Sequence, residues 1–190
     1  MDLLGCLDSS LTEDDRDRYI NWVYLCQHAD GGFKGFPGGD LGALRNNENS
    51  VWDPANVPAT FFALAILAIL KDDFSRVKRK ECLLWLKKMQ RPDGSFGETL
   101  GLGEKIEGGL DPRFGYTAMG IRAILRGRDQ GEMKDVPDVD IDLFVDCIRR
   151  SQVRPLPYFC RKKKLKFSSA MTAVFRNRLS MSLMVGNNFS

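Results

Sequence analysis

The feature that most constrains this 190-residue chain is a short motif that occurs twice at a fixed spacing. The motif reads QHADGGF at residues 27–33 and QRPDGSF at residues 90–96, an offset of 63 residues. A third copy begins at Gln152, but Pro155 and Leu156 stand where the Asp and Gly are expected. A helix that ends near the Gln and leads into an Asp-Gly turn explains the motif, because glycine tolerates positive φ. A repeat of this length predicts stacked helical units that bury their faces against one another.

The segments that follow the two glycine-rich loops, at 31–42 and 94–109, carry helical patterns. Residues 82–89 place apolar side chains at i, i+3, i+4 and i+7, which predicts a helix with one buried side. Residues 57–70 and 114–125 are instead apolar on nearly every side, which predicts helices enclosed by protein. Sustained alternation and Asn-Gly hairpin signals are both absent, so no strand is predicted. The sequence therefore predicts an all-α fold of helical hairpins joined by glycine-rich loops.

Charge divides the chain into two parts. Residues 153–190 contain eight Lys or Arg and no Asp or Glu, so residues 1–152 carry a net charge of −5 although the whole chain carries +3. The repeat also stops at Gln152. Both signals place a boundary between residues 1–152 and a basic tail, 153–190. Because the first part is mildly acidic, its charge gives no support to nucleic-acid binding.

Cysteine usage and hydropathy indicate the compartment. The five cysteines are scattered and form no Cys-x-x-Cys pair, which favours free thiols in a reducing compartment. The longest apolar stretch, 57–70, has fourteen residues, whereas a transmembrane helix needs about 20. The N-terminus has no basic start followed by an apolar block, so no signal peptide is expected. These observations predict a cytoplasmic protein without a transmembrane segment.

Several segments together resemble the β subunits of protein prenyltransferases, and most closely those of protein geranylgeranyltransferase type I. The resemblance extends over roughly residues 1–152. The segments that carry it are the two repeat motifs, WDPAN at 52–56, DDFSRV at 72–77, DPRFGY at 111–116 and IRRSQ at 148–152. The DDFSRV segment favours type I over the farnesyl and Rab enzymes.

The resemblance implies both a fold and an activity. The family's fold is an α/α toroid of six helical hairpins whose inner helices line a funnel, and residues 57–70 and 114–125 would be inner helices. The chain would form about half of this toroid, and the family's first hairpin is expected to be missing before Met1. The family's β subunit forms a heterodimer with a helical α subunit. It transfers a geranylgeranyl group from geranylgeranyl diphosphate to the cysteine thiol of a C-terminal CaaX sequence.

Four residues are carried over from the family as substrate-binding candidates. Arg113 matches an arginine between the isoprenoid and the peptide tail, and Tyr116 matches an aromatic of the isoprenoid pocket. Phe61 stands where type I enzymes often carry a pocket tyrosine. Asn56 stands where the family usually has a histidine that helps bind the substrate carboxylate through water. From the residues alone, core packing also explains Phe61 and Tyr116, and a surface or capping charge also explains Arg113.

Zinc is the family's cofactor, where it holds the substrate thiol as the nucleophilic thiolate. The resemblance implies ligands from an Asp-x-Cys pair and a distant His in the second half of the ring. Asp146 and Cys147 are adjacent rather than spaced in this way, and the single histidine, His28, lies in the first repeat loop. We therefore expect no metal ligand and no catalytic residue in this chain.

The sequence leaves alternatives open. A terpene cyclase shares the architecture, and Asp138, Asp140 and Asp142 resemble its acidic motif, although an acidic helix N-terminus explains them as well. The chain could also be a catalytically inactive fragment, or a module that binds an α subunit without turnover. Residues 153–190 resemble nothing in the family and are expected to be disordered or mis-spliced, with a basic amphipathic membrane segment as the alternative.

Overall fold

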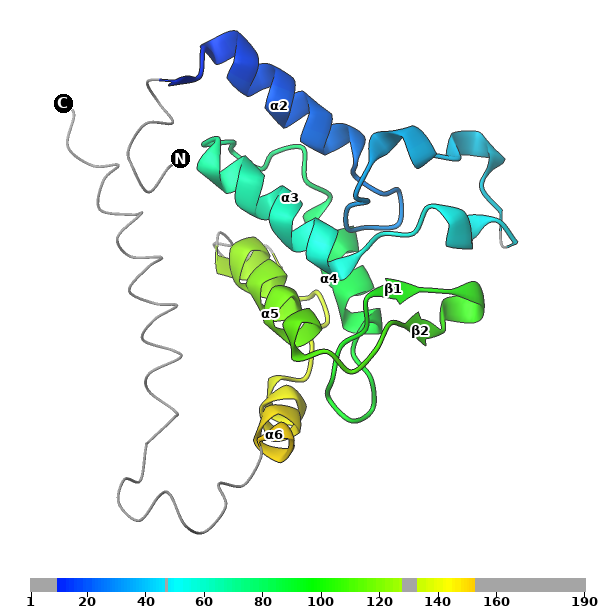
Figure 1. The fold of residues 1–190 in the computed structure, drawn as a ribbon. Coiled ribbons are helices and arrows are strands. Elements are labelled where there is room, and N and C mark those ends of the chain that lie inside the picture. Colours follow the sequence, from blue (N-terminus) through cyan, green and yellow to red (C-terminus); the bar gives the residue numbers. More distant parts are fainter. Residues whose placement is uncertain (1–9, 47, 128–132, 153–190) are drawn as a thin grey trace, which may run out of the picture. The chain divides into compact units, whose positions relative to one another are not determined.

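The computed structural model describes residues 10–46, 48–127 and 133–152. The expected basic tail, 153–190, lies outside these residues. Five α-helices follow one another in the described part of the chain (Figure 1): α2 (Glu13–Leu25), α3 (Val57–Ile69), α4 (Arg79–Lys88), α5 (Pro112–Gly127) and α6 (Ile141–Ser151). None of them is long and apolar enough to cross a membrane.

A short antiparallel pair of strands corrects the prediction that the chain has no strand. Strands β1 (Thr99–Leu100) and β2 (Ile106–Glu107) pair in the loop between α4 and α5. Two-residue strands are too short to give an alternating pattern, so the sequence carries no signal for them. Single turns of 3-10 helix complete the loops at Pro37–Gly39, Gly42–Leu44, Ser50–Trp52 and Leu102–Glu104.

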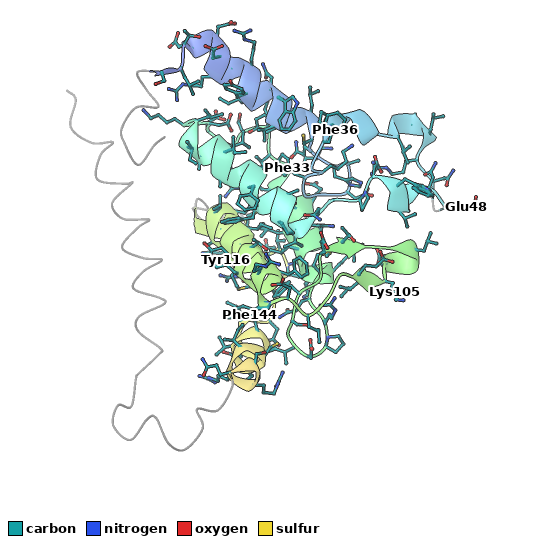
Figure 2. The ribbon with its side chains drawn as sticks, in the orientation of Figure 1. Phe33, Phe36, Glu48, Lys105, Tyr116 and Phe144 are labelled. Atoms are coloured by element: carbon teal, nitrogen blue, oxygen red, sulfur yellow. The ribbon has the colours of Figure 1, made fainter. Side chains whose placement is uncertain are left out.

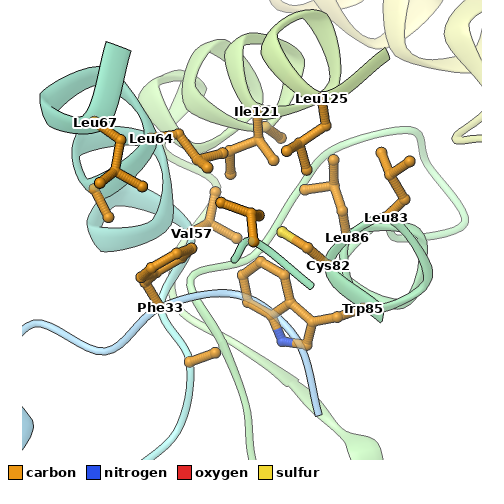
Figure 3. Close-up of a cluster of buried hydrophobic side chains, with 14 of the residues drawn as sticks. Phe33, Val57, Leu64, Leu67, Cys82, Leu83, Trp85, Leu86, Ile121 and Leu125 are labelled. Carbon is orange, nitrogen blue, oxygen red and sulfur yellow. The ribbon is translucent and has the colours of Figure 1, made fainter. Parts of the chain in front are cut away.

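Helices α3 and α5 lie side by side, and α2 and α4 pack against them. Figure 3 shows α3 and α5 facing each other through Leu64, Leu67, Ile121 and Leu125, all of which are almost fully buried. Helix α4 closes the cluster with Cys82, Leu83, Trp85 and Leu86. The buried side of α4 is therefore the apolar side that the spacing in residues 82–89 predicts.

The two repeat motifs form equivalent turns. In each turn the residue after the Gln donates a backbone hydrogen bond back across the turn, from His28 to Gly32 at 3.0 Å and from Arg91 to Ser95 at 2.8 Å. The aromatic residue that closes each motif, Phe33 or Phe96, is almost fully buried. The turns thus direct an aromatic side chain into the core.

The glutamine of each motif fixes its turn to the start of a later helix. The Gln27 side chain accepts a hydrogen bond from the Lys78 backbone amide at 2.7 Å, at the start of α4. The Gln90 side chain accepts one from the Asp140 backbone amide and donates to the Asp140 carbonyl, both at 2.8 Å, at the start of α6. The same joint therefore recurs from one hairpin to the next.

The glycine in each turn is required by both conformation and space. Gly31 has φ +106°, and a Cβ there would lie 2.4 Å from the Glu81 carbonyl oxygen in α4. Gly94 has φ +88°, and a Cβ there would lie 2.2 Å from the Leu143 carbonyl oxygen in α6. Both loops extend from the same side of the helices in Figure 1. The structure confirms that the two motifs are equivalent points of one repeat.

Candidate functional site

One side of α3 carries apolar side chains that the protein leaves exposed. Phe62, Ile66 and Ile69 are between 40% and 58% exposed. Their i, i+4 and i+7 spacing places them on one side of the helix. The prediction that residues 57–70 are enclosed by protein on every side is therefore wrong within the described part of the chain. The sequence does contain this 62–66–69 spacing, but uniform apolarity hides which side is exposed.

Aromatic rings connect this exposed side of α3 with α5. The Phe61 ring packs edge-to-face against Phe62 at a centroid distance of 5.5 Å and against Tyr116 of α5 at 5.7 Å. Phe61 is partly buried against the core, whereas Tyr116 is 51% exposed. Figure 2 shows Tyr116 at the helices, away from the loop residue Lys105. We call Phe61, Phe62, Ile66, Ile69 and Tyr116 the apolar face.

The structure thus brings together two of the four candidate residues, Phe61 and Tyr116. Arg113 lies in the first turn of α5, one turn before Tyr116, and its side chain is largely exposed. It forms a bidentate pair with Asp111, with N–O distances of 2.6 to 3.1 Å. The hydrogen bond from Arg113 lowers the pKa of Asp111, and the same bond raises the pKa of Arg113. In this conformation Arg113 is a paired surface charge at the end of the apolar face.

Asn56 has a structural position at the start of α3. Its side-chain oxygen accepts a hydrogen bond from the Ala59 amide at 2.9 Å, which caps the helix. Its side-chain nitrogen donates to Glu98 at 2.9 Å, which links the start of α3 to the second glycine-rich loop. Both ends of the amide are therefore engaged within the protein. The expected contact with a substrate carboxylate would use the second N–H of this amide or replace the hydrogen bond to Glu98.

A buried charged cluster organises the first loop. Asp53 accepts hydrogen bonds from the Leu41 amide at 3.0 Å, from Lys34 at 3.5 Å and from the Arg45 guanidinium. Arg45 also contacts the Nε2 atom of His28, which is buried. Burial lowers the pKa of His28, and the positive charge of Arg45 lowers it further. The only histidine of the chain therefore belongs to this cluster and not to the apolar face.

No group of three His, Cys, Asp or Glu residues lies close enough to hold a metal ion within the ranges that the structure describes. Cys26 and Cys82 are free and buried, and burial raises the pKa of both thiols, which disfavours the thiolate form that binds metals. The donor set therefore does not fit the zinc ion that the resemblance implies. We assign no chemical step through zinc to these residues.

The acidic residues between α5 and α6 have structural partners. Asp138 accepts hydrogen bonds from Arg122 at 2.9 and 3.0 Å. Burial acts to raise the pKa of Asp138, but the hydrogen bonds and the positive charge of Arg122, together with the Val139 amide and the charge of Arg126, lower the pKa overall. Asp140 caps α6 by accepting from the Leu143 amide at 2.8 Å. An ionised, paired carboxylate is a poor proton donor, so this arrangement does not favour the terpene cyclase alternative.

The DDFSRV segment at 72–77, from which the sequence predicts type I, makes contacts within the protein. The Tyr24 hydroxyl donates to Asp72 at 2.5 Å, and the Arg76 guanidinium lies 3.9 Å from the centre of the Tyr24 ring. Burial and the Asp72 carboxylate raise the pKa of Tyr24. These contacts fix the turn between α3 and α4 against α2. The segment thus makes structural contacts and is not part of the apolar face.

Repeated helical hairpins with glycine turns and an aromatic-rich apolar face define a helical repeat protein that presents an apolar surface. Residues 1–154 match the sequence profile of the prenyltransferase alpha-alpha toroid domain. The chain belongs to this family. The match confirms the predicted family and the predicted all-α, partial toroid fold.

Individual relatives agree with this assignment. Geranylgeranyl transferase type-1 subunit beta of Dictyostelium discoideum is 32% identical over 146 residues, covering 66% of this chain and 39% of that protein. Protein farnesyltransferase subunit beta of Pisum sativum is 23% identical over 137 residues, covering 71% and 28%. The structure of Candida albicans protein geranylgeranyltransferase-I complexed with GGPP matches with a TM-score of 0.59 and 25% identity, covering 74% and 38%. The chain therefore spans less than two fifths of each of these relatives.

Proposed function

We propose that the chain is part of the β subunit of a protein geranylgeranyltransferase type I, and that its apolar face forms part of the wall that binds the isoprenoid. The observation that carries this proposal is the apolar face itself. It continues from α3 to α5 through three aromatic rings in edge-to-face contact. Exposed apolar side chains that adjoin one another on a protein surface are typical of a binding site or an interface.

The chemistry of the isoprenoid suits this face. A geranylgeranyl chain is long, branched and wholly hydrocarbon, and its burial against apolar side chains gains about 25 cal/mol per Å² of surface removed from water. The aromatic rings add dispersion and fixed shape at a low entropy cost. Arg113 lies one turn from Tyr116 at the start of α5, where the helix N-terminus favours a negatively charged group, and such a group would compete with Asp111 for the Arg113 guanidinium.

Three features support the type I assignment over the farnesyl enzyme. One is the DDFSRV segment at 72–77, which forms the Tyr24–Asp72 contact. Another is the identity of 32% to a type-1 β subunit, against 23% to a farnesyltransferase β subunit. The third is the solved relative, Candida albicans protein geranylgeranyltransferase-I complexed with GGPP. Geranylgeranyl diphosphate is therefore the proposed prenyl donor.

The whole-protein activity belongs to the same proposal. A CaaX cysteine thiolate would form a bond to C1 of the geranylgeranyl chain while the C1–oxygen bond breaks and diphosphate leaves. We assign this transfer step to no described residue of the chain. An α subunit is the proposed partner, and the cytoplasm is the proposed location. The free Cys26, Cys82 and Cys147 thiols are consistent with a reducing compartment.

Titration of the full chain with a fluorescent geranylgeranyl diphosphate analogue tests the proposed binding. We expect saturable binding that Tyr116→Ala weakens about tenfold, because the substitution removes an aromatic contact worth ~1.4 kcal/mol. Unlabelled geranylgeranyl diphosphate should compete more strongly than farnesyl diphosphate.

Tyr19→Ala is the matched control, because Tyr19 of α2 is 54% exposed and Tyr116 is 51% exposed. The control should leave the affinity within about twofold of the wild type. Equal losses in the two variants, or no binding by the wild type, would contradict the proposed binding face. Stronger competition by farnesyl diphosphate would contradict the type I assignment alone.

A further inference from the structure

Helix α5 contains two glycines, Gly115 and Gly120, in its interior. Neither has the positive φ that would require glycine. A glycine inside a helix is less favourable than alanine by about 1 kcal/mol. Both glycines are buried. Their presence therefore calls for a reason in the packing around them.

Each glycine makes room for an aromatic ring from a neighbouring helix. A Cβ on Gly120 would lie 2.4 Å from Cε2 and 2.6 Å from Cδ2 of Phe61 in α3. A Cβ on Gly115 would lie 2.5 Å from Cε2 of Phe144 in α6. Both distances are far below ordinary van der Waals contact, so the ring would have to move if alanine replaced either glycine.

The surroundings of Phe61 decide the direction of that movement. On its inner side the ring packs against the buried cluster of the core, which is closely packed and yields little. Its edges meet Phe62 and Tyr116, whose own rings are about half exposed. A ring pushed away from Gly120 therefore moves outward, into the apolar face.

We propose that Gly120 is a specificity-determining residue for the isoprenoid, because it lets Phe61 lie flush between Phe62 and Tyr116 and so keeps the apolar face continuous from α3 to α5. This inference rests on the proposed isoprenoid-binding function. A Phe61 ring displaced outward separates the part of the face on α3, with Ile66 and Ile69, from the part on α5. A long isoprenoid that covers both parts loses more contact than a shorter one that covers mainly one part.

Competition binding on the full chain tests this role, with unlabelled C20 and C15 isoprenoid diphosphates displacing a fluorescent analogue. Gly120→Ala should weaken the C20 ligand about tenfold, the scale on which hydrophobic sites discriminate small changes in shape. The ratio of C20 to C15 affinity should fall at least about threefold. Adding Phe61→Leu to Gly120→Ala should restore C20 affinity to within about threefold of the wild type, because the shorter side chain no longer projects outward.

Gly115→Ala is the matched control. It introduces the same methyl group into the same helix and meets an aromatic ring at nearly the same distance, but that ring is Phe144 and lies outside the apolar face. It should leave both affinities within about twofold of the wild type. If the wild type binds the isoprenoid, two results would overturn the role of Gly120. One is an equal loss of affinity in Gly115→Ala and Gly120→Ala. The other is a ratio of C20 to C15 affinity that Gly120→Ala leaves unchanged. Absence of isoprenoid binding by the wild type would instead overturn the proposed function.

Discussion

Gly94→Ala should lower the free energy of unfolding by about 4 kcal/mol or more, a loss at the upper end of the range for single substitutions. Gly94 has φ +88°, which strains any residue with a side chain. Its new methyl group would lie 2.2 Å from the Leu143 carbonyl oxygen. A backbone carbonyl inside α6 cannot move without displacing the helix, so the second repeat turn would separate from α6. Denaturant unfolding followed by circular dichroism measures the effect.

Gly103→Ala separates the effect of the backbone conformation from the effect of the close contact. Gly103 also has positive φ, at +65°, but a Cβ there would meet no heavy atom within 4 Å. Its substitution should cost only about 1 kcal/mol, from the backbone conformation alone. If the free energies of unfolding of the two variants differ by less than about 1 kcal/mol, this would contradict the close contact between the second turn and α6.

Asp53→Ala should destabilise the protein by about 3–5 kcal/mol, because it removes the buried carboxylate that Lys34 and Arg45 share and leaves them only the half-exposed Asp40. The Asp53 side chain is 1% exposed, and the Lys34 side chain that pairs with it is 5% exposed. Arg45 would lose the same partner. Asp53 also accepts the Leu41 amide, so its removal frees the backbone of the first loop. Thermal and denaturant unfolding should both show the loss.

Asp40→Ala is the control for this prediction. Asp40 pairs with the same Lys34 at 3.2 Å, but its side chain is 49% exposed. Exposed ion pairs contribute about 0–1 kcal/mol, so this variant should lose no more than that. A loss for Asp53→Ala as small as for Asp40→Ala would mean that Asp53 does not hold the buried charges of the first loop.

The repeat made the two turns and their equivalence predictable, whereas the hydrogen bonds of the two Gln side chains came only from the structure. Gln27 and Gln90 hold the same place in two motifs, and equal spacing in a repeat requires equal positions in the fold. The one-sided pattern of 82–89 likewise identified the buried side of α4. The pairing of β1 with β2 could not be predicted, since Gly101–Lys105 hydrogen bonding and not side-chain alternation holds that hairpin.

The candidate site was predictable only in part. The family resemblance singled out Phe61 and Tyr116, and the structure places their rings in contact. Phe62, Ile66 and Ile69 were not singled out, because apolar residues that line a face and apolar residues that fill a core look alike in a sequence. The pairing of Arg113 with Asp111 depends on side-chain geometry at the start of α5, which residue spacing does not specify.

Photoaffinity labelling of the full chain with a geranylgeranyl diphosphate analogue that carries a photoreactive group in its tail tests most directly whether the apolar face binds the isoprenoid. Mass spectrometry of the peptides locates the label. Helix α2 offers an internal comparison, because its Tyr19, Trp22 and Leu25 side chains are exposed and apolar as well. We predict label on peptides from α3 and α5 that excess unlabelled geranylgeranyl diphosphate abolishes. Competable label concentrated on α2, with none on α3 and α5, would contradict the proposed face.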